Sequence, residues 1–221
     1  ATSLVYETLW ERQLHLVFGT SQVAVSTVLA AFMTGLALGG FGGSKWADKV
    51  KRPIRAYAML EFAIGLYALV FPWLLELAQP IYIGFYHAYS PSPEAFATFQ
   101  FVLLGSMLLP PTFCMGMTLP LLARFATTDS HECGEKVGRL YGANTIGAVV
   151  GTGIAGFVLL PRLGLETATM ITAAGNVLLC IGALTLARTV GELPPAAKSE
   201  EDTQGASWHI GALPIIALLA G

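Results

Sequence analysis

The chain has 221 residues, of which 54% are hydrophobic and only 12% are charged, and its mean hydropathy is +0.64. Soluble domains carry about a quarter charged residues, so this composition excludes an ordinary soluble enzyme and indicates a protein embedded in a bilayer. The net charge of −2 identifies no partner, and the widely spaced Cys114, Cys133 and Cys180 indicate neither a disulfide framework nor a zinc site.

Apolar stretches of about 20 residues, long enough to cross a bilayer as a helix, occur five times. They cover residues 20–40, 56–77, 96–125, 137–160 and 165–189. We expect residues 1–10 to be the end of an earlier helix, so that residues 1–189 form an all-α, six-helix transmembrane unit with a truncated first helix. The polar residues 190–207 predict a linker, and residues 208–221 predict the start of a further transmembrane helix. Because both ends are apolar, we expect the chain to be a piece of a longer protein.

Pro110 and Pro111 interrupt the fourth of these helices, counting the truncated one as the first. Proline has no backbone N–H, so the pair predicts a kinked fourth helix with freed carbonyl groups that neighbouring helices must cover. The preceding segment, residues 79–95, is rich in aromatic residues, and we expect it to be a loop at the membrane interface.

Basic residues orient the predicted helices. Ten of the twelve Lys and Arg residues lie in or beside the alternate connections 41–55, 126–136 and 190–207. Connections on the cytoplasmic side of a membrane carry an excess of Lys and Arg, so these three loops are predicted to be cytoplasmic.

The segment V-V-G-T-G-I-A-G-F at residues 149–157 has the spelling of a dinucleotide-binding turn. Such a turn requires a preceding strand, a water-accessible helix N-terminus and an acidic residue about 20 positions on. These glycines lie in an apolar run whose next acidic residue is Glu166, so we expect no nucleotide there. Small residues at four-residue spacing instead predict a helix-packing face, either a plain contact or a seam that opens during transport. Its members are Gly138, Gly142, Gly147, Gly151 and Gly156.

The segment A-D-K-V-K-R at residues 47–52 resembles the G-x-L-A-D-R-x-G-R-R loop of major facilitator transporters. Ser44, Lys51 and Pro53 depart from that pattern at its first Gly, its inner Gly and its last Arg. The resemblance implies a cytoplasmic gate loop formed by Asp48, Lys49 and Arg52, and the alternative is an ordinary solvated loop. Residues 138–156 are similar to the glycine motif of antiporters in the same superfamily.

A longer string of motifs is similar to the membrane part of bacterial fused major-facilitator/spermidine-synthase-like proteins. It comprises V-Y-E-T-L-W-E-R, L-L-P-P-T, M-G-M-T-L-P-L-L-A-R and G-R-L-Y-G-A-N-T-I-G-A. The resemblance implies a facilitator-like six-helix repeat in the bacterial inner membrane, followed by a second transmembrane repeat and a cytoplasmic polyamine aminopropyltransferase-like domain. Nothing in this chain resembles the glycine-rich loop of the synthase, so we expect no catalytic residue and no cofactor in it.

Ionisable side chains inside a membrane are costly and therefore mark candidate sites. Glu61 lies about two turns from the predicted cytoplasmic end of its helix. It is a candidate for binding a cation, a polyamine amine or a proton, and the alternative is a carboxylate that pairs with Arg55 or a polar neighbour, or that reaches toward the lipid headgroups. Glu7, Glu11 and Arg12, expected near the outer end of the first helix, form either an acidic mouth for a cation or an interfacial ion pair anchored by Tyr6 and Trp10.

Asn144 and Asn176 are polar positions in the last two full spans, where they form interhelical hydrogen bonds or contact a substrate. The run His131-Glu132-Cys133 is not expected to bind a metal, because three adjacent side chains do not readily face one ion.

Two functions are consistent with these patterns. One is transport or channelling of a small cationic solute such as a polyamine. The other is a non-transporting membrane anchor or assembly subunit for a synthase-like domain or a larger membrane complex. The expected partners are the lipid bilayer, the second repeat and the synthase-like domain, and no nucleic acid. The two functions differ in whether Glu61 and Glu7 face a water-filled cavity or are sealed by packing.

Overall fold

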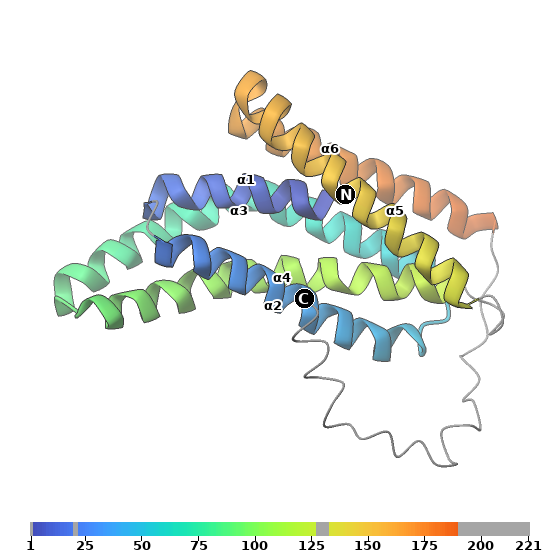
Figure 1. Ribbon diagram of the computed structural model, residues 1–221, viewed down its shortest axis with the longest axis horizontal. Coiled ribbons are helices and arrows are strands. Elements are labelled where there is room, and N and C mark those ends of the chain that lie inside the picture. The colour runs from blue at the N-terminus through green and yellow to red at the C-terminus, as the bar shows by residue number, and fades with distance from the viewer. Residues whose placement is uncertain (1, 20–21, 127–132, 190–221) are drawn as a thin grey trace, which may run out of the picture.

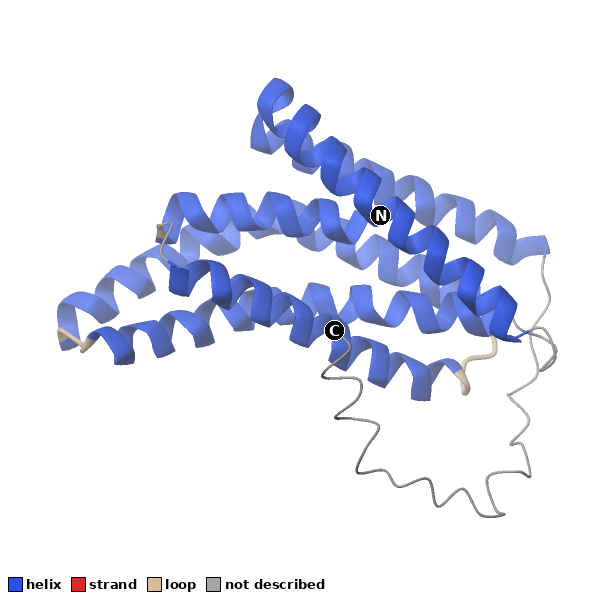
Figure 2. Ribbon diagram, in the orientation of Figure 1, coloured by secondary structure: helices blue, strands red, loops and turns tan. Residues whose placement is uncertain are grey.

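The computed structural model describes residues 2–19, 22–126 and 133–189, and these contain helices and short connections but no strand (Figures 1 and 2). The elements are α1 (Thr2–Phe18), α2 (Gln22–Ala47), α3 (Pro53–Tyr89), α4 (Pro93–Ala126), α5 (Cys133–Ile154), a π-helical turn η2 (Ala155–Leu159) and α6 (Leu160–Thr189). Four stretches are long and apolar enough to cross a bilayer, namely Val25–Ala47, Pro53–Tyr89, Pro93–Ala126 and Val137–Thr189. The chain is therefore an all-α, multi-pass membrane protein, as predicted. The expected linker 190–207, the further helix 208–221 and residues 131–132 lie outside the described residues.

The last of these stretches contains two helical arms that run in opposite directions (Figure 1). Its backbone leaves the helical conformation at Gly164, where φ is 77° and ψ is 174°. Glycine reaches positive φ without the steric cost that a Cβ imposes, so the chain reverses there. The reversal falls between the predicted spans 137–160 and 165–189. The glycines at 151–156 lie within helical structure, so this segment lacks the strand and turn that a dinucleotide site requires.

The helices are longer, and their connections shorter, than the sequence predicts. The segment 79–95, expected as a loop, is helical except at residues 90–92. Aromatic rings explain this difference, because they pack across the end of α3 and the start of α4. The Phe85 and Phe99 rings stack at 3.9 Å, and the Tyr82 and Phe96 rings lie 4.9 Å apart. The predicted loops 41–55 and 126–136 are also too long, since α2 ends at Ala47, α3 begins at Pro53 and α5 begins at Cys133.

The helix ends that flank the predicted basic connections lie together at one end of the bundle, on the right in Figure 1. This end contains the α2–α3 connection, the end of α4, the start of α5 and the end of α6. The opposite end contains the end of α1, the α3–α4 connection and the turn between the α5 and α6 arms. The alternation of basic residues along the chain therefore corresponds to a real difference between the two ends of the molecule.

The closest helix contact joins α2 to α4, and glycines make it. Gly35, Gly39 and Gly43 recur every four residues on α2 and are buried. A Cβ added at Gly39 would overlap the Phe113 carbonyl oxygen and lie 3.0 Å from the Gly116 Cα. Backbone therefore touches backbone, the arrangement by which small residues hold transmembrane helices together. The GxxxGxxxG spacing of these residues is visible in the sequence, but the sequence analysis predicts a glycine packing face only at residues 138–156.

The predicted glycine face on α5 does not form a comparable contact. Nothing in the described chain lies within 4 Å of a Cβ built on Gly138, Gly142 or Gly156. Gly147 and Gly151 are half-buried, while Ile146 and Val149 beside them are 68% and 70% exposed. Among the described residues, no other helix approaches Gly138, Gly142 or Gly156 at close range.

The proline pair in α4 is accommodated by a neighbouring helix. Helix α4 continues through Pro110 and Pro111, so the prolines do not end it. Because Pro111 has no N–H, the Met107 carbonyl loses its helical partner. The Tyr67 hydroxyl of α3 donates a hydrogen bond of 2.6 Å to that carbonyl. The expectation that a neighbouring helix covers a carbonyl freed by the proline pair is confirmed at this position.

Replacing Gly39 by Ala should destabilise the bundle, because the new methyl group would overlap the α4 backbone, which cannot move away as a flexible side chain would. Overpacking of this kind costs about 1–3 kcal/mol. Gly40→Ala is the matched control, since its Cβ would be no closer than 3.9 Å to the Gly116 carbonyl oxygen. Equilibrium unfolding in mixed micelles measures both variants. Equal losses of stability would contradict the assigned α2–α4 seam.

A double-mutant cycle tests the Tyr67 hydrogen bond. Tyr67→Phe should cost about 1 kcal/mol of unfolding free energy, because it leaves a buried carbonyl without a partner. In a Pro111→Ala background the restored N–H of residue 111 bonds the Met107 carbonyl, so Tyr67→Phe should then cost clearly less. The same unfolding assay gives the coupling energy, and additive effects would show that the hydroxyl does not compensate for the proline.

Candidate functional site

Glu61 is the centre of a buried polar cluster that joins three helices. Its side chain lies on α3 and is 5% exposed. Asn176 of α6 donates through Nδ2 to Glu61 Oε2 at 2.9 Å and to the Glu61 main-chain carbonyl at 3.2 Å. The Tyr6 hydroxyl of α1 donates to Asn176 Oδ1 over a longer 3.4 Å. Two residues singled out separately, Glu61 and Asn176, are thus direct partners.

Residues at four-residue spacing on α3 shape the cluster. Tyr57, one turn before Glu61, lies close enough to interact with its carboxyl. Gly65, one turn after it, lets α6 approach, since a Cβ there would lie 3.1 Å from the Asn176 Cβ. Residues four apart share one face of a helix, so Tyr57, Glu61 and Gly65 form a stripe that was readable from the sequence. Tyr57 and Gly65 were not recognised as part of the site.

The described partners of Glu61 are neutral groups. Arg55, the basic residue expected as an alternative partner, is exposed at the surface of α3. Of the alternatives for Glu61, the structure therefore contains pairing with a polar neighbour, which is Asn176. An isolated charge in a membrane interior is costly, and the hydrogen bond from the Asn176 amide reduces that cost.

The cluster is sealed from water by side-chain packing. Asn176 and Tyr6 are both completely buried. On α1, Tyr6 stacks on Trp10 at 5.2 Å, and Trp10 packs on Phe71 at 5.0 Å. Tyr6 and Trp10 therefore lie in the core of the bundle, and their role as anchors of an interfacial ion pair stays a prediction.

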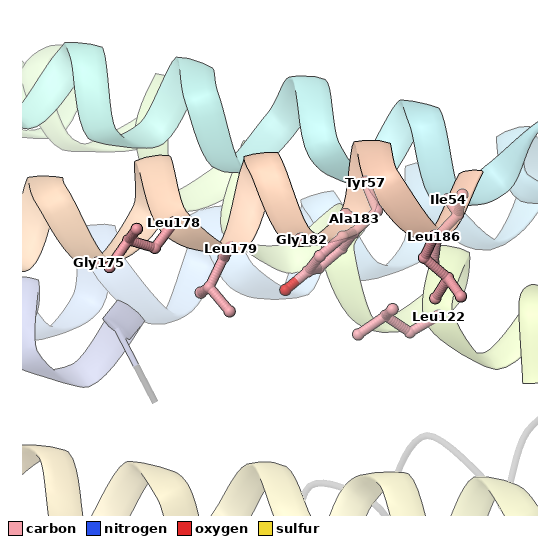
Figure 3. Close-up of a pocket in the computed structure, with 9 residues that line it drawn as sticks. All are labelled: Ile54, Tyr57, Leu122, Gly175, Leu178, Leu179, Gly182, Ala183 and Leu186. Atoms are coloured by element: carbon pink, nitrogen blue, oxygen red, sulfur yellow. The ribbon is translucent and has the colours of Figure 1, made fainter. Parts of the chain in front are cut away.

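An open groove of about 400 Å³ lies beside the cluster, between α6 and the helices α3 and α4 (Figure 3). Its walls are almost entirely apolar, with Ile54, Leu122 and Leu186 at one end and Gly175 and Leu178 at the other. Tyr57 also lines this groove, so one side chain touches both the groove and the Glu61 carboxyl. Tyr57 is thus the residue that separates the buried carboxyl from the groove.

The acidic group on α1 does not occupy the position predicted for it. Helix α1 continues well beyond Glu11 to Phe18, so Glu7 lies inside the bundle, directly after Tyr6 in the chain. Glu7 is half-buried, and its Oε2 atom is buried without a hydrogen-bond partner among the described residues. Glu11 lies 4.0 Å from His15, one turn on, and Arg12 is exposed. The acidic mouth and the ion pair with Arg12 therefore both stay predictions.

The remaining predicted residues lie apart from the cluster. Asn144 is exposed on α5, in contrast to Asn176. Asp48 and Lys49 lie in the turn after α2, and Arg52 is the N-cap of α3, with Pro53 at the first helical position. The gate function of this connection stays a prediction.

A second recess lies between α1, α3 and α6, towards the end of the bundle that contains Gly164. Its volume is about 680 Å³. Two carboxylates from different helices line it, Glu76 of α3 and Glu166 of α6, together with the amide of Gln13 on α1. None of these residues was identified as a candidate. Their sequence separation conceals them, since only the packing of three helices places them in one recess.

The Glu61–Asn176 pair can be tested by single and double replacement. Asn176→Leu should cost about 1–3 kcal/mol of unfolding free energy, because it leaves the Glu61 carboxyl buried without its principal partner. Glu61→Met combined with Asn176→Leu should recover most of this loss, since both polar groups are then removed. Equilibrium unfolding in mixed micelles measures the cycle. A double variant as unstable as the sum of the singles would contradict direct pairing.

Comparison with family models, curated proteins and solved structures finds no match to this chain. Its function is therefore inferred from the buried polar cluster, the two recesses and the membrane-spanning fold.

Proposed function

We propose that this chain is the membrane-embedded half of a facilitator-like protein that transports or channels a small cationic solute, a polyamine being the candidate class. The observation that carries the proposal is the Glu61 carboxyl, which is buried within membrane-spanning helices and accepts a hydrogen bond from Asn176, whose own Oδ1 accepts one from Tyr6. Ionisable groups at such positions are rare and usually line a substrate, ion or proton path.

The hydrogen bonds suggest how binding would couple to movement. The Asn176 amide now occupies the position from which a cation would contact Glu61 Oε2. A cation that replaces the amide breaks the side-chain hydrogen bond between α3 and α6. Binding would thereby favour separation of these helices, as a carrier requires if its site is to open alternately to the two sides. Tyr57, between the carboxyl and the apolar groove, would be the side chain that moves first.

Family membership is part of the same proposal. The motif resemblance, the all-α fold and the gathering of basic residues at one end support the membrane part of a fused facilitator/spermidine-synthase-like protein in a bacterial inner membrane. The basic end would face the cytoplasm. Such a protein would supply a second transmembrane repeat and a soluble synthase-like domain as partners. The reading frame on either side of these 221 residues provides a direct test, because it would encode both.

A non-transporting anchor is the second candidate, and one observation favours it. Glu61 is 5% exposed and Asn176 is fully buried, so no water-filled path reaches the carboxyl in this conformation. In an anchor, the cluster would serve only to fix the packing of α1, α3 and α6. The exposed apolar faces would then contact lipid or the helices of a larger complex.

Uptake of labelled spermidine by liposomes containing the intact protein tests transport. Glu61→Gln keeps an oxygen that accepts the Asn176 hydrogen bond but cannot carry a negative charge. Hydrogen bonds to charged groups contribute about 1.5–3 kcal/mol, so the initial rate of uptake should fall by about tenfold or more. Glu94→Gln, an exposed change at the start of α4, is the matched control and should leave the rate unchanged.

The outcomes separate the two candidates. Uptake that is unaffected by Glu61→Gln would remove the assigned role of the carboxyl. Absence of uptake by a protein that is folded and stable in the bilayer would contradict transport and favour the anchor.

A further inference from the structure

We propose that the recess between α1, α3 and α6 is a binding site for an organic ammonium ion that carries an apolar chain. This site is separate from the Glu61 cluster. It does not depend on transport, because an anchor as well as a carrier can hold such a ligand.

The lining of the recess is acidic. Glu76 and Glu166 are exposed, lie on different helices and line the same cavity of about 680 Å³. Its other polar residues, Gln13, Gln79 and Thr169, are neutral, and no basic residue is among the lining residues. The recess therefore attracts a cation.

Gln13 supplies an independent indication of a ligand. Its side chain is 7% exposed, and its Oε1 atom is buried without a hydrogen-bond partner among the described residues. A buried acceptor without a partner costs about 1–3 kcal/mol, so such atoms are rare unless something else satisfies them. Gln13 lines the recess, and an N–H donor bound there would complete its hydrogen bonding. An alkylammonium group has three donors, which matches two carboxylates and one amide oxygen.

The walls favour an organic cation over a bare metal ion. Leu16, Leu69, Trp73 and Met170 contribute most of the remaining surface. A methylene chain can lie against these walls, and the described residues contain no group of three or more His, Cys, Asp or Glu residues that could hold a metal ion. The Trp73 ring can also hold an ammonium group over its face. The volume of the recess falls within the usual range for small-molecule sites, about 300–1,000 Å³.

The position of the recess along α3 defines two sources of the ligand. Glu76 lies about 35 Å along α3 from Pro53, at about 1.5 Å per residue. The hydrocarbon core is about 30 Å thick, so Glu76 is near the membrane interface opposite the basic end. An ammonium group at that level belongs either to a free amine such as spermidine or to an ethanolamine lipid headgroup. Both share the chemistry that the recess recognises.

Binding measurements on the intact protein in nanodiscs test the site. Isothermal titration with spermidine in phosphatidylcholine nanodiscs examines the free amine, and native mass spectrometry after exchange into nanodiscs containing phosphatidylethanolamine examines the lipid. Glu76→Gln combined with Glu166→Gln should weaken binding by about tenfold or more, since charge-assisted hydrogen bonds are lost. Glu94→Gln is the matched control, and thermal unfolding of every variant verifies the fold.

Gln13→Leu distinguishes a ligand contact from a packing defect. If Oε1 accepts a hydrogen bond from the ammonium group, the variant should bind more weakly although it is as stable as the parent or more so. Retention of phosphatidylethanolamine without spermidine binding would support the site and identify a lipid as its ligand.

Three results would overturn the proposal. They are binding of neither probe, binding that survives the Glu76 and Glu166 replacements, and binding that is lost only in Glu61→Gln. The last result would assign the amine to the Glu61 cluster, so a failure of this site is distinguishable from a failure of the proposed transport function.

Discussion

Most of this molecule depends on one constraint, which is that polar groups inside a bilayer cannot turn to water for hydrogen bonds. Each must find a partner within its helix or on a neighbouring one. Thr112 and Thr172 donate to carbonyls one turn earlier in their own helices. Tyr67 covers the carbonyl that Pro111 leaves free, and Asn176 satisfies Glu61. Hydrogen bonds between helices thus mark the places where the chain departs from simple apolar packing.

Two of the contacts between helices differ in how much relative movement of the helices they permit. The α2–α4 contact at Gly35, Gly39 and Gly43 joins backbones and leaves no room for adjustment. The contact of α3 with α6 includes the Glu61–Asn176 hydrogen bonds and the small Gly65, and under the proposed function a ligand would replace Asn176 at the carboxyl. If any part of the bundle moves, α6 and its neighbours on α3 are better suited to move than α2 and α4.

The membrane helices could be predicted from the sequence because apolar run length is a local property, and the bilayer requires a minimum length. The partners of the buried polar residues could not be predicted in this way, because they depend on how the helices pack against one another. Glu61 and Asn176 were each recognisable as costly polar residues, but they are 115 positions apart. The α2 and α5 glycine stripes have similar spacing, and only the arrangement of helices determines which one meets another backbone. Likewise, the aromatic segment after Gln79 has the composition of an interfacial loop. It is helical because its rings pack against Phe96 and Phe99.

The length of the α3–α4 hairpin has a consequence for the outside of the molecule. Helix α3 has 37 residues and α4 has 34, so each is about 50 Å long or more. Helices of this length exceed the hydrocarbon core of about 30 Å even when tilted, so their joined tips extend out of it to the lipid headgroups or beyond. An antibody tag or a protease site can therefore be inserted at residues 90–92. It would report which side of the membrane this connection faces and would leave the packed helices undisturbed.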